Sequence, residues 1–238
     1  ILRENVVKLA RMIGYTPRSA RSARAIANIQ VQTTFPYPKS VTIAKGLVAN
    51  FTGLDNNNFV FSVPTDISQS VDSLTGIASF PDTVLYEGLF LTDTFVKDNT
   101  ERQRFILTNA RCDTSSIIVQ VTSGQVVEKY LQATDITKID STSKVFFLEE
   151  SEYQIPEILF GDGVVGKALN NGDVVNVTYT TSAGRGANGL KVFENIGTYR
   201  DNLGNAITTG INVSMTTDPD GGAEPETTES IKFAAPKF

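Results

Sequence analysis

The stretch FGDGVVGKALNNGDVVNVTYTT, Phe160–Thr181, decides the fold class of this chain. Gly161, Gly163 and Gly166 have the spacing of a glycine-rich turn that binds dinucleotides. Such a turn needs a strand before it, a helix after it and an acidic residue about 20 residues further on. A strand at Glu157–Phe160 is plausible, but the glycines lead through an Asn-Asn-Gly turn into a second strand. We reject a cofactor site, because no helix N-terminus would face the phosphates.

The same glycines are instead predicted to form structural turns. Asp-Gly and Asn-Gly pairs are favoured in the tight turns of β-hairpins. We therefore expect a hairpin-like unit over Leu159–Tyr179, with its first three glycines in a β-turn and at the start of a strand. At least one of them should have a positive φ, which glycine adopts without a steric penalty. The residues assigned to these structural turns are Gly161, Asp162, Gly163, Gly166, Asn171 and Gly172.

Short segments rich in β-branched and aromatic residues recur along the chain, bounded by turn residues. They predict strands at Phe59–Val63, Arg104–Ala110, Ser116–Gly124, Lys144–Glu150 and Asp173–Thr181. Few helical patterns separate these segments, so we expect an antiparallel β body.

The N-terminal residues predict a first helix with an apolar stripe. Apolar residues repeat there at helical spacing, and Gly14 is a plausible residue to end the helix. We expect the stripe to contact another chain. Its members are Leu2, Val6, Leu9 and Ile13.

A second helix is predicted over Pro17–Ile29, with Thr16 as its N-cap and proline at its first position. Arg18, Arg21 and Arg24 would then fan across one side of this helix, separated by small residues. The hypothesis is that they contact another chain, and the alternative is a solvated basic face. Nucleic-acid binding is disfavoured, because the chain is acidic overall and no aromatic residue lies between the arginines.

The C-terminal residues 216–238 are rich in Pro, Gly, Thr and Glu. They predict a linker that leads into a helix at Glu226–Ala235 and on to a further region. Asp218 and Asp220 resemble the start of a calcium loop, but Gly222 occupies the third ligand position and no bidentate Glu follows. We therefore expect no metal site there.

The composition excludes several kinds of chemistry. The 238-residue chain has a net charge of -5, no His and one Cys, Cys112, which we expect to be a structural thiol. Ser-His and Cys-His nucleophile pairs and an internal disulfide are therefore impossible. No apolar run approaches the ~18 residues of a membrane helix. We expect no enzyme activity, cofactor, small-molecule substrate or membrane partner.

These patterns together predict an α+β, mainly β fold: short N-terminal helices, then antiparallel β modules and a C-terminal linker. The expected segments are a helical segment at 1–30, a central β domain at 31–150, a second β module at 151–215 and the linker at 216–238. Because the sequence begins with Ile1 rather than Met, we expect it to be part of a longer protein.

Four stretches, in this order, resemble the baseplate J-like family, which includes the baseplate wedge proteins of T-even-type contractile-tailed phages. The resemblance implies a structural role in a ring around the tail hub, which couples baseplate rearrangement to sheath contraction. It also implies other wedge proteins as partners, a homodimer within the ring, and a place in the virion tail after assembly in the host cytoplasm. The stretches are KLARMIGYTPRSARSARA, YEGLFLTDTFV with RFILTNARCDTSSIIVQV, LFGDGVVGKALNNGDVVNVTYTTSAGRGANG, and GGAEPETTESIKFAAPKF.

The alternative is a β domain of an adhesin or tail-associated protein that binds or cleaves carbohydrate. Aromatic residues make up 9% of the chain and there is no Trp, which argues against a surface for stacking sugars.

Overall fold

A computed structural model of the chain describes residues 3–13, 15, 17–53, 55–101, 103–151 and 155–237. Strands account for 46% of the chain and helices for 12%, which confirms the mainly β fold class with short helices. The strands form two nearly closed β-barrels with antiparallel or mixed pairing.

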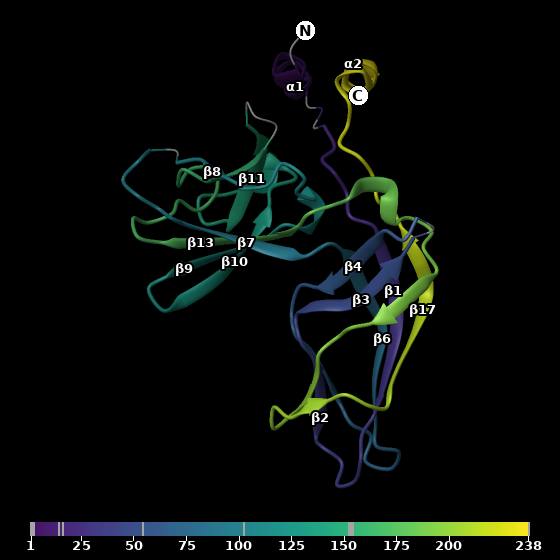
Figure 1. Ribbon diagram of the computed structural model, residues 1–238. Helices are drawn as coiled ribbons and strands as arrows, with labels where there is room; N and C mark the ends of the chain where they lie inside the picture. Colours follow the sequence, from purple (N-terminus) through teal and green to yellow (C-terminus); the bar gives the residue numbers. More distant parts are fainter. Residues whose placement is uncertain are drawn as a thin grey trace. The chain divides into compact units, whose positions relative to one another are not determined.

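Two compact units make up the chain, and each is built from segments that are separate in the sequence (Figure 1). Unit 1 comprises Ile1–Ala20, Leu91–Tyr179 and Pro225–Phe238, and unit 2 comprises Arg21–Phe90 and Thr180–Glu224. The boundaries of the four consecutive segments expected from the sequence do not coincide with the boundaries of these units.

Unit 1 contains a seven-stranded sheet with strand order β7-β13-β9-β10-β11-β12-β8. Strands β10 and β11 run parallel, whereas the pairs β13–β9, β9–β10, β11–β12 and β12–β8 are antiparallel. The elements are α1 (Arg3–Met12), β7 (Phe90–Val96), β8 (Phe105–Ile106), η1 (Thr114–Ser116), β9 (Ile118–Ser123), β10 (Val126–Gln132), η2 (Ile136–Lys138), β11 (Val145–Glu150), β12 (Pro156–Phe160), β13 (Val174–Thr180), α2 (Thr228–Ala234) and η4 (Ala235–Lys237).

A side-chain clamp links the two ends of this sheet. The Asp93 carboxylate on β7 accepts hydrogen bonds from Thr108 N at 2.7 Å and from Thr108 Oγ1 at 2.9 Å, just after β8. It also accepts one from Tyr179 Oη at 2.8 Å, and the Tyr179 side chain is fully buried. The clamp joins the edge strands where few backbone bonds can, because β8 has only two residues.

Unit 2 contains a six-stranded sheet with order β14-β3-β4-β6-β1-β17 and a four-stranded sheet with order β16-β15-β2-β5. Phe51 and Phe61 contact each other in its core, with ring centroids 4.6 Å apart and ring planes tilted by 54°. The elements are β1 (Arg24–Gln32), β2 (Ser40–Ile43), β3 (Gly46–Thr52), β4 (Asn58–Val63), β5 (Ile67–Ser70), β6 (Ile77–Glu87), η3 (Gly184–Ala187), β14 (Val192–Asn195), β15 (Tyr199–Asp201), β16 (Ala206–Ile207) and β17 (Ile211–Asp220).

The second helix predicted over Pro17–Ile29 is wrong. Residues 17–23 have no regular secondary structure apart from a β-bridge at Arg21, and β1 starts at Arg24. Ala25, Ala27 and Ile29 are all fully buried, so the apolar residues follow the two-residue period of a strand. Pairing with β6 and β17 on both sides outweighs the helix propensity of alanine and arginine. The predicted N-cap, Thr16, lies outside the described residues.

The other terminal predictions have mixed outcomes. The first helix is confirmed as α1, while its predicted stop, Gly14, lies outside the described residues. The C-terminal helix is confirmed as α2, with Thr227 as its N-cap. The linker predicted from residue 216 is wrong at its start, because β17 continues to Asp220 along β1.

The hairpin-like unit over Leu159–Tyr179 is also wrong. β12 pairs with β11 and β8, whereas β13 pairs with β9 and β7. The two strands flanking the glycines are therefore not neighbours. The long Gly- and Asn-containing segment crosses between distant positions of one sheet instead of turning the chain back on itself.

Candidate interaction site

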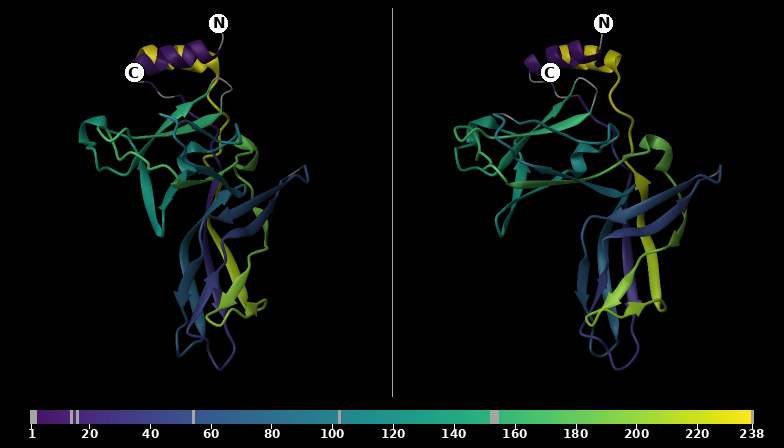
Figure 2. Two further views of the ribbon diagram at one scale, coloured as in Figure 1. Left: turned by 90° about the vertical axis from the view of Figure 1, so that its left-hand side faces the viewer. Right: turned by 60° about the vertical axis from the view of Figure 1, so that its left-hand side comes forward.

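The helices α1 and α2 pack against each other and form what we call the helix pair (Figure 2). Val6, Val7 and Ala10 on α1 are buried in one apolar cluster with Ile231 and Ala235. A seven-residue helix such as α2 is marginal by itself in water, so this packing stabilises it. The pair brings together the first and last described segments of unit 1.

The helix pair also carries exposed apolar side chains. Leu9 is 63% exposed, Met12 82% and Ile13 55%, and Phe233 on α2 is 70% exposed. The predicted stripe is therefore split, because Val6 is buried against α2 while Leu9 and Ile13 face solvent. Its fourth member, Leu2, lies outside the described residues. The exposed apolar residues Leu9, Met12, Ile13 and Phe233 are called the exposed helix surface below.

A buried carboxylate holds the segments next to the helix pair together. Only 2% of the Glu226 side chain is exposed. Its oxygens accept hydrogen bonds from Tyr15 Oη at 2.7 and 2.9 Å, Ser230 Oγ at 2.8 Å and Arg18 N at 3.2 Å. Its backbone N donates to Arg18 O at 2.9 Å, and its carbonyl oxygen accepts from the Arg3 guanidinium. One residue thus contacts the N-terminal segment at three places.

Burial and hydrogen bonding act in opposite directions on the pKa of Glu226. Burial alone raises the pKa of this carboxyl, because it disfavours the charged form. Hydrogen bonds from Tyr15, Arg18 N and Ser230 outweigh burial, so the pKa lies below its ordinary value. The Tyr15 hydroxyl donates hydrogen bonds to the same carboxylate, and this raises the pKa of Tyr15. Glu226 is therefore charged at neutral pH, and its surroundings satisfy that charge.

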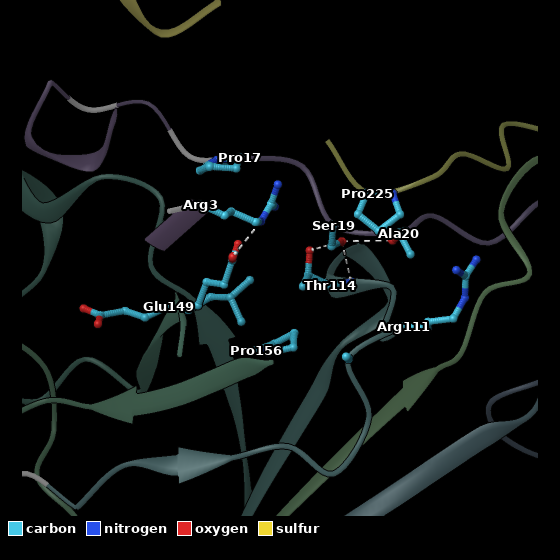
Figure 3. Close-up of a pocket in the computed structure, with 12 residues that line it drawn as sticks. Arg3, Pro17, Ser19, Ala20, Arg111, Thr114, Glu149, Pro156 and Pro225 are labelled. Carbon is cyan, nitrogen blue, oxygen red and sulfur yellow. Dashed lines mark hydrogen bonds and ion pairs between the residues drawn. The ribbon is translucent and has the colours of Figure 1, made fainter. Parts of the chain in front are cut away.

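Unit 1 also contains a small cavity, whose lining includes Pro225, the residue before Glu226 (Figure 3). Its volume is about 210 Å³. Arg3 Nε contacts Glu150 Oε1 at 3.2 Å on one wall, and Ser19 Oγ is 2.8 Å from Thr114 Oγ1 on another. These polar groups bind one another, as the dashed lines in Figure 3 show. We interpret the cavity as a gap between packed segments rather than a ligand site.

The three arginines predicted to share one helix face do not do so. Arg18 Nε lies 4.0 Å from Glu226 Oε2 within unit 1. In unit 2, the backbone of Arg21 pairs with Ala223, and the Arg24 guanidinium lies 5.0 Å from the centre of the Tyr86 ring. All three are exposed, so their predicted contact with another chain stays a prediction.

The glycine-rich turn is structural in its geometry. Gly163 and Gly166 have φ of 87° and 85°, which confirms the expected positive φ, and no helix follows them. A Cβ on Gly161 would lie 2.2 Å from the carbonyl carbon of Gly166, so the two backbones need this glycine. Asp162 Oδ1 accepts from Val164 N at 2.9 Å and from Val165 N at 3.0 Å. The expected strand start is wrong, because residues 161–170 form a loop.

The second predicted turn is confirmed. Asn171 and Gly172 form a turn in which Gly172 has φ of 87°. Gly172 N donates to Lys97 O at 2.8 Å, and Lys97 N donates to Asp173 O at 2.9 Å. This turn therefore fixes the end of β7 against the start of β13.

Cys112 has the surroundings of a structural thiol. Its side chain is fully buried, and burial raises its pKa well above the ordinary value, with the charges of Asp113 and Asp93 adding to the effect. A protonated, buried thiol is a poor nucleophile. Among the residues that the structure describes, no three Asp, Glu or Cys side chains are grouped to hold a metal ion. No helix in the described part of the chain is both long and apolar enough to cross a membrane.

Sequence analysis missed Glu226 and Tyr15 as the centre of this site. The N-cap pattern around Thr227 gave one local signal, because a polar residue before a helix invites hydrogen bonds. Nothing local indicates that Glu226 meets residues more than 200 positions earlier. No protein-family model matches this chain, and comparison with curated proteins finds no match either.

Proposed function

We propose that this chain is a structural subunit of the baseplate wedge of a contractile phage tail, and that the helix pair docks it to a second copy of itself. The observation that carries the proposal is the exposed helix surface: Leu9 and Met12 on α1, Ile13 directly after it, and Phe233 on α2. Exposed apolar groups on a helix pair favour association, because docking removes their surface from water. That the assembly is a phage baseplate is inferred from the resemblance of four sequence stretches to the baseplate J-like family.

A scaffold role agrees with the chemistry of the described residues. The buried carboxylate of Glu226 accepts hydrogen bonds from Tyr15 and Ser230, and the thiol of Cys112 is buried. Arg18, Arg21 and Arg24 remain predicted contacts with neighbouring subunits, although they do not lie on a helix and Arg24 is the first residue of β1. In this proposal the wedge proteins around the hub are the further partners.

Native mass spectrometry of the chain, alone and mixed with candidate wedge proteins, tests this function. We expect a dimer that joins a larger complex. Replacing Leu9, Met12 and Ile13 together by Ser should give a monomer with unchanged circular dichroism. The matched control replaces Ile136 and Val164 by Ser. These two residues lie elsewhere in unit 1 and are 65% and 74% exposed. A wild-type chain that stays monomeric alone and in every mixture would contradict the proposal.

The carbohydrate-binding alternative has weaker support. A cavity of about 660 Å³ in unit 1 contains Phe105 and Phe160, but Phe105 is buried and its ring meets Phe160 edge to face at 5.4 Å. Sugar stacking needs an open ring face. Binding of the chain on a glycan array would favour this alternative over the wedge subunit.

A further inference from the structure

Three loops of unit 2 lie together and form what we call the loop cluster: residues 33–39, 71–76 and 202–209. Thr33 donates to Gly76 O through its backbone N at 2.9 Å and through Oγ1 at 2.7 Å. Lys39 N donates to Asn202 Oδ1 at 2.8 Å. Hydrogen bonds therefore tie the first loop to each of the other two.

Each loop exposes one large apolar side chain. Phe35 is 85% exposed, Leu74 89% and Leu203 80%; among the other large apolar residues that the structure describes, only Met12 is at least 80% exposed. A side chain that is almost fully exposed adds little to the stability of the fold. Three of them on adjacent loops therefore call for an explanation outside unit 2.

Two of the loops hold their apolar residue in the same way. Asp72 Oδ1 accepts a hydrogen bond from Leu74 N at 2.9 Å, and Asp201 Oδ1 accepts one from Leu203 N at 2.8 Å. In both turns the aspartate precedes the leucine by two residues, which is the spacing of an Asx turn. The turns fix the backbone that presents each leucine, so less conformational freedom is lost when a partner binds.

The third apolar residue is supported by a ring. Phe35 meets Tyr37 edge to face, with ring centroids 5.7 Å apart. The Tyr37 ring lies so close to Gly76 that a Cβ there would approach its Cε1 to 2.4 Å. Gly76 also has φ of 72°, which glycine tolerates and other residues rarely adopt.

A hollow of about 470 Å³ opens between residues 32–39 and 201–209. Its lining includes the apolar side chains of Pro36, Leu203 and Ile207 together with Lys39 and Asp201. The carboxylate of Asp201 is occupied by N–H donors of its own turn. Lys39 is exposed, and within the described chain its amino group has no ion pair or hydrogen bond. The hollow thus offers apolar walls and one available positive charge.

We propose that the loop cluster docks an extended segment of a partner protein in which an acidic residue lies next to an apolar one. The apolar side chain enters the hollow, and the carboxylate pairs with Lys39. Phe35 and Leu203 cover the segment from the sides, as apolar anchors do at protein interfaces. This surface belongs to unit 2 and does not depend on the proposed role of the helix pair.

The charges favour a protein over an anionic membrane as the partner. Within the loop cluster the charges of Lys39 and Asp72 cancel, so the cluster has no net positive charge. Anionic lipids attract clusters of Lys and Arg, which are absent from residues 33–39, 71–76 and 202–209.

Selection from a displayed library of random peptides on the intact chain tests the proposal. We expect enrichment of peptides with Asp or Glu beside Leu, Ile or Phe. For a selected peptide, fluorescence polarisation should show affinity about tenfold lower for Lys39→Glu, because a like charge then faces the carboxylate. The matched control is Lys45→Glu, an exposed lysine near the opposite end of β2. Phe35→Ser with Leu203→Ser should also weaken binding and leave circular dichroism unchanged.

Three outcomes would overturn the inference. The first is a selection that enriches no acidic and apolar pair. The second is peptide binding that is equally sensitive to Lys39→Glu and Lys45→Glu. The third is binding to phosphatidylcholine vesicles that Phe35→Ser, Leu74→Ser and Leu203→Ser abolish, which would assign the three side chains to a membrane surface instead.

Discussion

The helix pair of unit 1 and the loop cluster of unit 2 both expose large apolar side chains, but carboxylates hold them in different ways. Beside the helix pair, one buried carboxylate, Glu226, joins segments from both ends of the sequence. In the loop cluster, Asp72 binds backbone N–H groups within four residues of itself, and Asp201, next to the cluster, does the same. The first arrangement is long-range and buried, and the second is local and exposed.

This difference determines how far a substitution should act. When a buried charged group is removed, its hydrogen-bond partners stay buried with neither water nor protein to bind. Such unsatisfied polar atoms lower the free energy of unfolding. An exposed group can be replaced by water at little cost. We therefore expect changes at Glu226 to destabilise the whole helix pair and changes at Asp72 to affect one turn.

The largest effect is expected for Glu226→Gln. The amide keeps the shape but loses the charge that accepts from Tyr15, Ser230 and Arg18 N. We expect the free energy of unfolding of unit 1 to fall by about 3 kcal/mol at neutral pH, because hydrogen bonds to charged groups are the strong ones. Chemical denaturation followed by circular dichroism measures it.

The control for this change is Glu229→Gln on the same helix. The Glu229 side chain is 80% exposed and pairs with Lys232 at 2.6 Å. An exposed pair one helical turn apart contributes about 0.5 kcal/mol or less. Equal losses for the two variants would show that burial of Glu226 does not matter.

The next effect is a dependence on pH. The pKa of Glu226 in the folded protein lies below the ordinary value of about 4.3. Its stabilising contribution is complete above that ordinary value and is lost as the pH falls through the lowered folded pKa, because the unfolded chain binds the proton more readily. The difference in unfolding free energy between wild type and Glu226→Gln should therefore shrink in acid. A difference that stays constant down to strongly acidic pH would contradict the assigned pKa direction.

The features of the fold also differ in how far the sequence predicts them. The turn at Asn171-Gly172 is encoded by adjacent residues and is confirmed, while Gly163 has the expected positive φ within a loop. The helix α1 follows from apolar spacing. Strand segments such as Phe59–Val63 follow from β-branched and aromatic composition, and β4 covers them. These features share a local cause, so residues within a few positions are enough to predict them.

Features that depend on distant partners were missed. β1 contains Ala, Arg and Asn, which favour other conformations, and it is a strand because β6 and β17 pair with both of its edges. Glu226 lies in a segment that reads as an acidic linker, and only its contacts with Tyr15 and Arg18 make it a buried site. The loop cluster likewise joins three loops that are far apart in sequence, so no single stretch indicates that these loops are hydrogen-bonded to one another.

A third prediction concerns Gly76, the one position where the loop cluster has tight packing. Gly76→Ala forces a Cβ to within 2.4 Å of the Tyr37 ring at φ of 72°. We expect a loss of about 2 kcal/mol from backbone strain and displacement of the ring, measured by chemical denaturation. Gly204→Ala is the control, because its φ is 88° but no atom lies within 4 Å of the added Cβ. That variant should lose about half as much, from strain alone.

The smallest effect is expected for Asp72→Ala. The informative result is which residues change their rate of hydrogen exchange. The carboxylate of Asp72 accepts from Leu74 N, Thr75 N and Thr75 Oγ1, all within its own turn. These bonds lower its pKa, so the charged form is the one that holds the turn. Its removal should leave the melting temperature nearly unchanged but speed the hydrogen exchange of the Leu74 and Thr75 amides, which then open to water. Faster exchange in residues 33–39 as well would mean that the three loops move as one unit. The sharp contrast between a local and a long-range carboxylate would then hold only for stability, and not for the motion of the docking surface.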